Sequence, residues 1–155
     1  MKLGLISDTH GHVPHAAHAA LADVDCILHA GDVGPMNVIT ELEIIAPVRA
    51  VLGNTDYDIS LPETRLEEFL GQTILIHHIV DVDYPSQIVQ KLVKSEAPNI
   101  VVFGHTHVPF DEQRDGIWYM NPGSASRPRD GSAPSVAILD FSGKIPVLKS
   151  IALIE

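Results

Sequence analysis

Short runs of apolar and β-branched residues recur along the chain, and each run ends at turn-forming residues. Runs of this length and composition are typical of β-strands. We expect strands at residues 2–7, 25–30, 46–52, 73–77, 99–103, 117–120, 135–141 and 145–153. Residues 64–70 are expected to form one more strand, which pairs with 73–77 as a hairpin because Gly71-Gln72 lies between them.

Three stretches between these runs have helical character. Residues 14–21 are rich in alanine, residues 35–45 place apolar side chains near helical spacing, and residues 86–95 have one apolar face. Strands that are joined through helices pair in parallel by right-handed crossovers. A second hairpin is expected near the end of the chain, with Ser142-Gly143 as its turn. The pattern therefore predicts an α/β domain in which two sheets face each other and helices lie outside.

Composition narrows the class of protein. A chain of 155 residues with 45% hydrophobic residues is expected to form a single domain over residues 1–155. A net charge of -10 argues against a long nucleic-acid partner, because such binding depends on Lys and Arg. We expect no membrane span, a cytoplasmic location and a buried Cys26 in its apolar run. Nine histidines beside twenty acidic residues favour a metal.

Polar motifs follow four of the predicted strands at the point where each strand ends. Taken singly, each motif is close to what a shuffled chain would contain, but their order and their positions are not. In open α/β sheets, ligands bind outside the carboxyl ends of the strands, so residues directly after parallel strands converge. The motifs are Asp8-Thr9-His10, Gly31-Asp32, Gly53-Asn54 and Gly104-His105-Thr106-His107.

Carboxylate oxygens and imidazole nitrogens suit zinc, manganese or iron. A carboxylate that bridges two ions about 3.5–4 Å apart would help clamp the oxygens of a phosphoryl group in transfer. The alternatives are that Asp8 and Asp32 serve as a turn residue and a helix cap, and that Asn54 only shapes a turn. Ser124, Arg127 and Arg129 are candidates for contacting substrate phosphate, although a turn with solvated arginines would give the same pattern.

As a set, these motifs resemble those of the calcineurin-like metallophosphoesterases, and in particular the small YfcE-type phosphodiesterases. The similarity covers nearly the whole chain. It comprises Ile6-Ser7-Asp8-Thr9-His10-Gly11, His29-Ala30-Gly31-Asp32, Gly53-Asn54, Gly104-His105-Thr106-His107, Asn121-Pro122-Gly123-Ser124 and Pro128-Arg129.

The resemblance implies a four-layer αββα sandwich of two mixed sheets, which agrees with the two-sheet interpretation. It also implies two divalent ions per chain, of which manganese is the first expectation and iron, nickel, cobalt and zinc are alternatives. A hydroxide between the ions would attack phosphorus, with Asp32, Asn54 and His105 as catalytic residues. One ion would be held by Asp8, His10, Asp32 and His107, and the other by Asp32, Asn54, His77 and His105.

Two positions depart from the family pattern. Many members have a histidine after the Gly-Asn pair that protonates the leaving group, whereas this chain has Thr55, which cannot act as an acid near neutral pH. The chain also has His77-His78 where the family usually has His-Gly. Because adjacent strand residues face opposite sides, only one of the two should reach the metals. We expect His77, which occupies the motif position.

The resemblance therefore implies a metal-dependent phosphoesterase, most readily a phosphodiesterase that acts on a small phosphorylated substrate. Monoesters and pyrophosphates stay open as substrates, as does a homo-oligomeric state. The alternative function is a non-catalytic scaffold, because the same fold serves as a scaffold subunit in the retromer coat. Fold alone does not decide between them.

Overall fold

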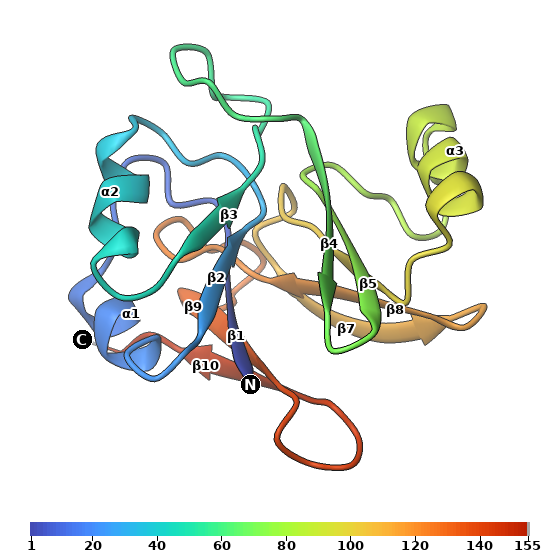
Figure 1. The fold of residues 1–155 in the computed structure, drawn as a ribbon. Coiled ribbons are helices and arrows are strands. Elements are labelled where there is room, and N and C mark those ends of the chain that lie inside the picture. Colours follow the sequence, from blue (N-terminus) through green and yellow to red (C-terminus); the bar gives the residue numbers. More distant parts are fainter. Residues whose placement is uncertain (155) are drawn as a thin grey trace.

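Two five-stranded β-sheets pack face to face in the computed structural model of this chain, which describes residues 1–154 (Figure 1). The first sheet has the order β10-β9-β1-β2-β3 and the second has the order β4-β5-β6-β8-β7. The strands of the first sheet are β1 (Lys2–Ile6), β2 (Cys26–His29), β3 (Val48–Ala50), β9 (Ser135–Asp140) and β10 (Val147–Ala152). Those of the second are β4 (Thr64–Phe69), β5 (Gln72–His77), β6 (Ile100–Val102), β7 (Pro109–Arg114) and β8 (Ile117–Pro122).

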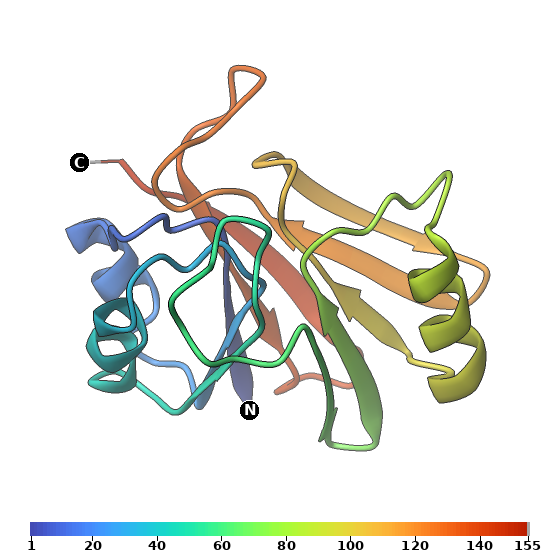
Figure 2. The same ribbon diagram turned by 90° about the horizontal axis from the view of Figure 1, so that it is seen from above.

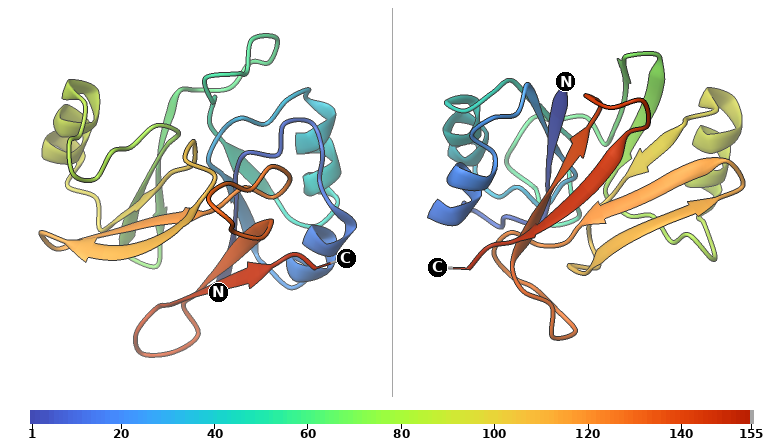
Figure 3. Two further views of the ribbon diagram at one scale, coloured as in Figure 1. Left: turned by 180° about the vertical axis from the view of Figure 1, so that it is seen from behind. Right: turned by 90° about the horizontal axis from the view of Figure 1, so that it is seen from below.

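Both sheets are mixed. Strands β1, β2 and β3 pair in parallel, as do β5, β6 and β8, whereas β9, β10, β4 and β7 are antiparallel to their neighbours. The C-terminal strand β10 lies at the edge of the first sheet beside β9 (Figure 3). Both predicted hairpins, β4–β5 and β9–β10, are confirmed by their antiparallel pairing.

Three helices cover the outer faces of the two sheets. Helices α1 (His15–Ala20) and α2 (Asn37–Glu43) lie on the first sheet, and α3 (Gln87–Glu96) lies beside the second sheet on the opposite side of the molecule (Figure 2). The expected four-layer αββα arrangement is thereby confirmed. Within residues 1–154, no helix is long and apolar enough to cross a membrane.

Alternation along the strands divides the core into three layers. On β1, Leu3 and Leu5 pack between the two sheets, whereas Ile6 packs under the helices of the first sheet. On β5, Ile74 and Ile76 join the layer between the sheets and Leu75 faces the α3 side. Full burial of one such side chain stabilises the fold by about 1.5–3 kcal/mol, so these layers fix the register of both sheets.

Strand β7 was missing from the sequence expectation. Its residues Pro109–Arg114 are mostly polar and exposed, because β7 is an edge strand with little to bury. It pairs with β8 through a two-residue turn, Asp115-Gly116, in which both residues have positive φ, 51° and 80°. An Asp-Gly pair with these angles is a strong hairpin signal. That dipeptide is the feature of the sequence from which the strand could have been predicted.

Candidate metal centre

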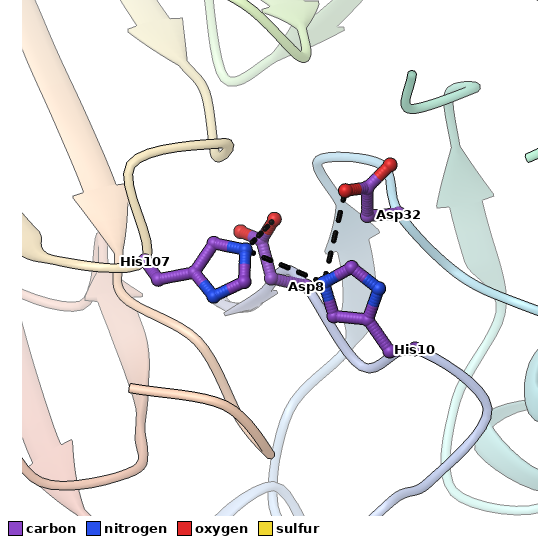
Figure 4. A group of neighbouring side chains, drawn as sticks. All are labelled: Asp8, His10, Asp32 and His107. Atoms are coloured by element: carbon purple, nitrogen blue, oxygen red, sulfur yellow. Dashed lines mark hydrogen bonds and ion pairs between the residues drawn. The ribbon is translucent and has the colours of Figure 1, made fainter. Parts of the chain in front are cut away.

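Two acids and two histidines from three loops converge where strands of both sheets end (Figure 4). Asp8 and His10 follow β1, Asp32 follows β2, and His107 lies in the loop after β6. One ligand atom from each of the four lies within 4.8 Å of the others. The structure thus brings together the four residues that the family resemblance assigned to one ion.

The imidazole nitrogens and carboxylate oxygens of these four residues lie close together. The His10 Nε2 atom lies 3.3 Å from His107 Nε2 and 3.7 Å from Asp32 Oδ2. His107 Nε2 lies 3.2 Å from Asp8 Oδ1. Asp8, Asp32 and His107 are almost completely buried, so water does little to screen the repulsion between the two carboxylates.

The other ring nitrogen of His107 defines what its Nε2 atom can do. Its Nδ1 lies 2.5 Å from the carbonyl oxygen of Arg127, which only accepts hydrogen bonds, so Nδ1 carries the proton. In the neutral ring, Nε2 then presents a lone pair toward the Asp8 carboxylate. A lone pair that faces a buried carboxylate fits a cation between them, and anchoring of the second nitrogen is characteristic of metal-ligating histidines. The donor set therefore fits a divalent ion.

A second group adjoins the first through Asp32. The Asn54 Oδ1 atom lies 2.9 Å from His105 Nδ1 and 3.1 Å from His78 Nε2. His78 Nε2 is 3.5 Å from Asp32 Oδ1, whereas the other carboxylate oxygen of Asp32 faces His10. The carboxylate of Asp32 thus lies beside an imidazole of each group.

His77, which we expected in the second group, lies elsewhere. Its Nδ1 lies 2.9 Å from the hydroxyl oxygen of Thr64 on the neighbouring strand β4. His78 takes the expected place: its side chain is buried, and its Nδ1 donates to the Ala30 carbonyl at 2.7 Å. The reason is the alternation along β5, because position 78 continues the inward face of Ile74 and Ile76. The sequence assignment of His77 is corrected to His78 on this geometry.

The backbone of the site is held in an unusual conformation. Within residues 1–154, nine non-glycine residues have positive φ, and five of them belong to the two groups. Asp and His are among the side chains that tolerate this region best, but each such residue still costs free energy that the surrounding fold must offset. The five are Asp8 (52°), His10 (46°), Asp32 (52°), His105 (67°) and His107 (63°).

Two glycines allow the loops to approach each other closely. A Cβ atom at Gly53 would lie 2.0 Å from the backbone nitrogen of Asp32, and one at Gly104 would lie 2.0 Å from Ser7 Oγ and 2.8 Å from Asp8 Oδ2. All three distances are well inside van der Waals contact. Only glycine at these positions leaves room for the carboxylates of the site.

Ser124 supports the site from below instead of facing a substrate. It is fully buried, and its hydroxyl donates to the carbonyl oxygen of Asp8 at 2.8 Å. Ser126 donates to the Thr9 carbonyl at 2.7 Å and so holds the same loop. The expectation that Ser124 contacts substrate is therefore corrected, because its buried hydroxyl donates to the backbone of the site loop. Arg127 and Arg129 are exposed beside the site, as a substrate contact would require.

Asp56 is a supporting residue that the motifs did not single out. Its carboxylate accepts hydrogen bonds from the backbone N–H groups of Val33 (3.0 Å), Gly34 (2.8 Å) and Gly53 (2.8 Å). It thereby ties the loop after β2 to the loop after β3. Thr55 is exposed, and its backbone N–H donates to Asp32 Oδ1 at 2.9 Å.

Burial and neighbouring charges shift the pKa values of the site in opposite directions. Burial raises the pKa of the Asp8 carboxyl above its usual value. Burial acts in the same sense on Asp32, but hydrogen bonds from His78 and from the Thr55 backbone outweigh it and hold the pKa of Asp32 well below its usual range. For His78, burial lowers the pKa, yet the hydrogen bonds to Asp32 and Ala30 prevail and raise it. Asp32 is thus kept as a carboxylate, which is the form that binds a cation.

The fold and this site define a class of α/β protein that carries metal-ligating side chains at the strand ends of two packed sheets. Residues 1–144 match the family model of the calcineurin-like phosphoesterase superfamily domain, and the chain belongs to this superfamily. The resemblance drawn from the motifs is therefore confirmed.

Named relatives agree with this placement. The chain is 38% identical over 152 residues to a probable metallophosphoesterase of Methanothermobacter thermautotrophicus, covering 93% of this chain and 88% of the relative. It is 28% identical over 175 residues to the phosphodiesterase YfcE of Escherichia coli, covering 99% and 92%. Vps29 of Entamoeba histolytica, solved with zinc, shares the fold with a TM-score of 0.77 at 19% identity, covering 99% of this chain and all (100%) of that one.

Proposed function

We propose that this chain is a phosphodiesterase that uses two divalent ions, with manganese as the first metal to test. One ion would be held by Asp8, His10, Asp32 and His107, and the other by Asp32, Asn54, His78 and His105. The observation that carries the proposal is Asp32, whose two carboxylate oxygens face the two groups separately. A family of phosphoesterases and the YfcE relative support the reaction class.

The residues of the chain prepare the site before a substrate arrives. The Nδ1 atoms of His78 and His107 are anchored to backbone carbonyls, which holds the rings against rotation and directs their Nε2 atoms toward the carboxylates of the site. Two divalent ions at such a centre would supply Lewis-acid chemistry that stabilises charge on phosphoryl oxygens. His105 and Asn54, at the more exposed side of the site, are proposed to contact the reacting phosphate as well.

Arg127 and Arg129 are proposed to attract that phosphate. Burial is the first cause that lowers the pKa of His10, and the charge of Arg127 adds to it. Burial likewise lowers the pKa of His105, with smaller contributions from His78 and Arg129. Both arginine charges therefore reach the site, where they complement a phosphodiester anion.

The net charge of -10 favours a small phosphorylated substrate over a long nucleic acid. Thr55 offers no proton to a departing oxygen. We therefore expect hydrolysis to depend steeply on the acidity of the leaving alcohol, since general acid help is typically worth about 10²- to 10⁴-fold.

The test is hydrolysis of bis(p-nitrophenyl) phosphate and p-nitrophenyl phosphate by protein loaded with one metal at a time. Manganese should support turnover of the diester, and chelation should abolish it. Asp32→Asn should lower kcat by about 10²-fold or more and weaken both metal sites, because several kcal/mol of charge stabilisation depend on them. His10→Ala should chiefly weaken one site, and Asp58→Asn, an exposed neighbour outside both groups, serves as the matched control.

Two metals still bound to Asp32→Asn with full turnover would refute the bridging role. A second function, that of a scaffold, is favoured by the fold shared with Vps29. Protein that binds its metals tightly and hydrolyses neither ester would support the scaffold over the enzyme.

A further inference from the structure

A hollow of about 520 Å³ opens beside His105, on the side of the second sheet. It lies between the segment that follows β5 and the loop that joins β6 to β7. His105 and Thr106 belong to its wall, and His105 is also a neighbour of Asn54 in the candidate metal centre. The hollow therefore adjoins the site at His105, and its volume is sufficient for a compact organic group.

The inner wall of the hollow is apolar. Phe103 and Phe110 line it with ring centroids 5.7 Å apart and a tilt of 58° between the rings. Ile79, which also lines the hollow, is 43% exposed. The rest of the apolar lining is made by Val80, Val82, Val108 and Pro109. Binding the carbon skeleton of a ligand against such a surface is favourable, because it removes apolar area from water.

The charged groups of the hollow all have one sign. Among the described residues that line it, Asp81, Asp83 and Asp130 are carboxylates and none is a lysine or arginine. Asp83 is paired with Arg114, which lies outside the lining, so its charge is partly neutralised. Asp81 accepts hydrogen bonds from the backbone N–H groups of Asp83 and Tyr84 in its own turn. Asp81 and Asp130 therefore give the lining of the hollow a negative charge that no lining lysine or arginine offsets.

We propose that the hollow receives the alcohol part of the phosphodiester and selects an uncharged or cationic alcohol over one that carries a further anionic group. The inference rests on the proposed phosphodiesterase function and names its substrate class. The phosphate would lie at the metal centre near Arg127 and Arg129, and the alcohol would extend past His105 toward Phe110. A second phosphate or a carboxylate on that alcohol would face Asp81 and Asp130 at a cost in binding.

Three esters with the same p-nitrophenolate leaving group test this selectivity. They are p-nitrophenyl phosphocholine, p-nitrophenyl ethyl phosphate and p-nitrophenyl carboxyethyl phosphate. We expect kcat/KM to fall in that order, with at least about a tenfold ratio between the first and the last, since two exposed carboxylates attract one and repel the other. Most of this difference should appear in KM, because the discrimination is one of binding.

The variant that probes the charge is Asp81→Asn combined with Asp130→Asn. Asn accepts the same turn hydrogen bonds as Asp81 and tolerates the positive φ of 53° at position 130. The tenfold ratio should shrink by about two- to fivefold for each carboxylate removed. The matched control combines Asp23→Asn with Asp58→Asn, two exposed acids outside the hollow, and should leave the ratio unchanged.

Phe110→Ala tests the apolar wall independently and should raise KM for the choline and ethyl esters. An equal kcat/KM for all three esters in the wild type, or a ratio unaffected by the double Asp variant, would overturn the inference while leaving the phosphodiesterase intact. Failure to hydrolyse any of the esters would overturn the proposed function and this inference together.

Discussion

The imidazole of His78 illustrates how one hydrogen bond prepares a side chain for metal binding. Its Nδ1 donates to the Ala30 carbonyl, which orients the ring and leaves Nε2 facing Asp32 and Asn54. In His77, one residue earlier, Nδ1 is hydrogen-bonded to the hydroxyl of Thr64. Two chemically identical neighbours thus have different environments, because a strand turns successive side chains to opposite faces.

At the residue scale we predict that His78→Ala lowers metal affinity and diester turnover much more than His77→Ala does. His78→Ala should reduce metal affinity and diester turnover by about 10²-fold, the scale of several kcal/mol of lost charge stabilisation. His77→Ala should retain turnover within a small factor, because its contact with Thr64 lies on β4. Titration with manganese, followed by kcat measured at saturating metal, separates binding from catalysis. A larger loss for His77→Ala would show that our assignment is reversed.

At the scale of elements, the site is built by loops whose conformations are unfavourable in isolation. Asp8, Asp32 and His107 all have positive φ, so their loops depend on the hydrogen bonds that cross between them. Asp56 supplies three of these bonds and joins the loops after β2 and β3. Ser124 performs the corresponding task for the loop after β1.

We predict that Asp56→Ala lowers both stability and metal affinity although Asp56 is not a proposed ligand. Removing the carboxylate leaves backbone N–H groups without partners, which costs about 1–3 kcal/mol in the free energy of unfolding. The check is urea unfolding of the metal-free protein, followed by manganese titration. Asp58→Ala is the control, since Asp58 is an exposed acid two residues away. Unchanged stability in Asp56→Ala would mean that the loops hold their conformation by other contacts.

At the scale of the whole molecule, the site and the fold are coupled thermodynamically. Asp8 and Asp32 are buried side by side, and burial raises the pKa of Asp8 because its charge is poorly solvated. A cation that binds only the folded chain stabilises it by mass action.

Manganese should therefore raise the melting temperature. At a free manganese concentration about 100 times Kd, the free energy of unfolding rises by about 2.7 kcal/mol. This corresponds to an increase in melting temperature of roughly 5–10 °C for a domain of this size. Differential scanning calorimetry with and without chelator measures the shift, and Asp32→Asn should show a much smaller one. An equal shift in wild type and Asp32→Asn would place the bound metal elsewhere.

His29 couples stability to pH from within the core. It is fully buried, its Nδ1 accepts from the Gly31 N–H at 3.2 Å, and its Nε2 lies 3.0 Å from the Thr9 hydroxyl oxygen. Burial lowers the pKa of its imidazole from 6.5 to about 3. Between these values the unfolded chain binds a proton that the folded chain does not, so stability is lost as pH falls below about 6.5.

By this linkage the titration of His29 should lower the free energy of unfolding by about 2 kcal/mol between pH 7 and pH 5. His29→Asn, which keeps an acceptor near the Gly31 N–H, should remove that part of the pH dependence while lowering stability at both pH values. Urea unfolding of both proteins at the two pH values, with chelator present, measures the difference. Parallel pH profiles would show that His29 does not titrate on unfolding.

The sequence by itself determined the layered α/β architecture and the convergence of Asp8, His10, Asp32 and His107. Apolar periodicity marks the strands, and parallel strands joined through helices bring the residues after them to one edge. The tertiary structure decided between His77 and His78, because Ile74-Leu75-Ile76 is apolar toward both faces of a covered strand and its pattern does not reveal which face is inward. It also decided the roles of Ser124 and Asp56, which act on backbone groups far away in the chain. Side-chain periodicity reports burial, whereas hydrogen bonds to distant backbone atoms exist only once the loops have met.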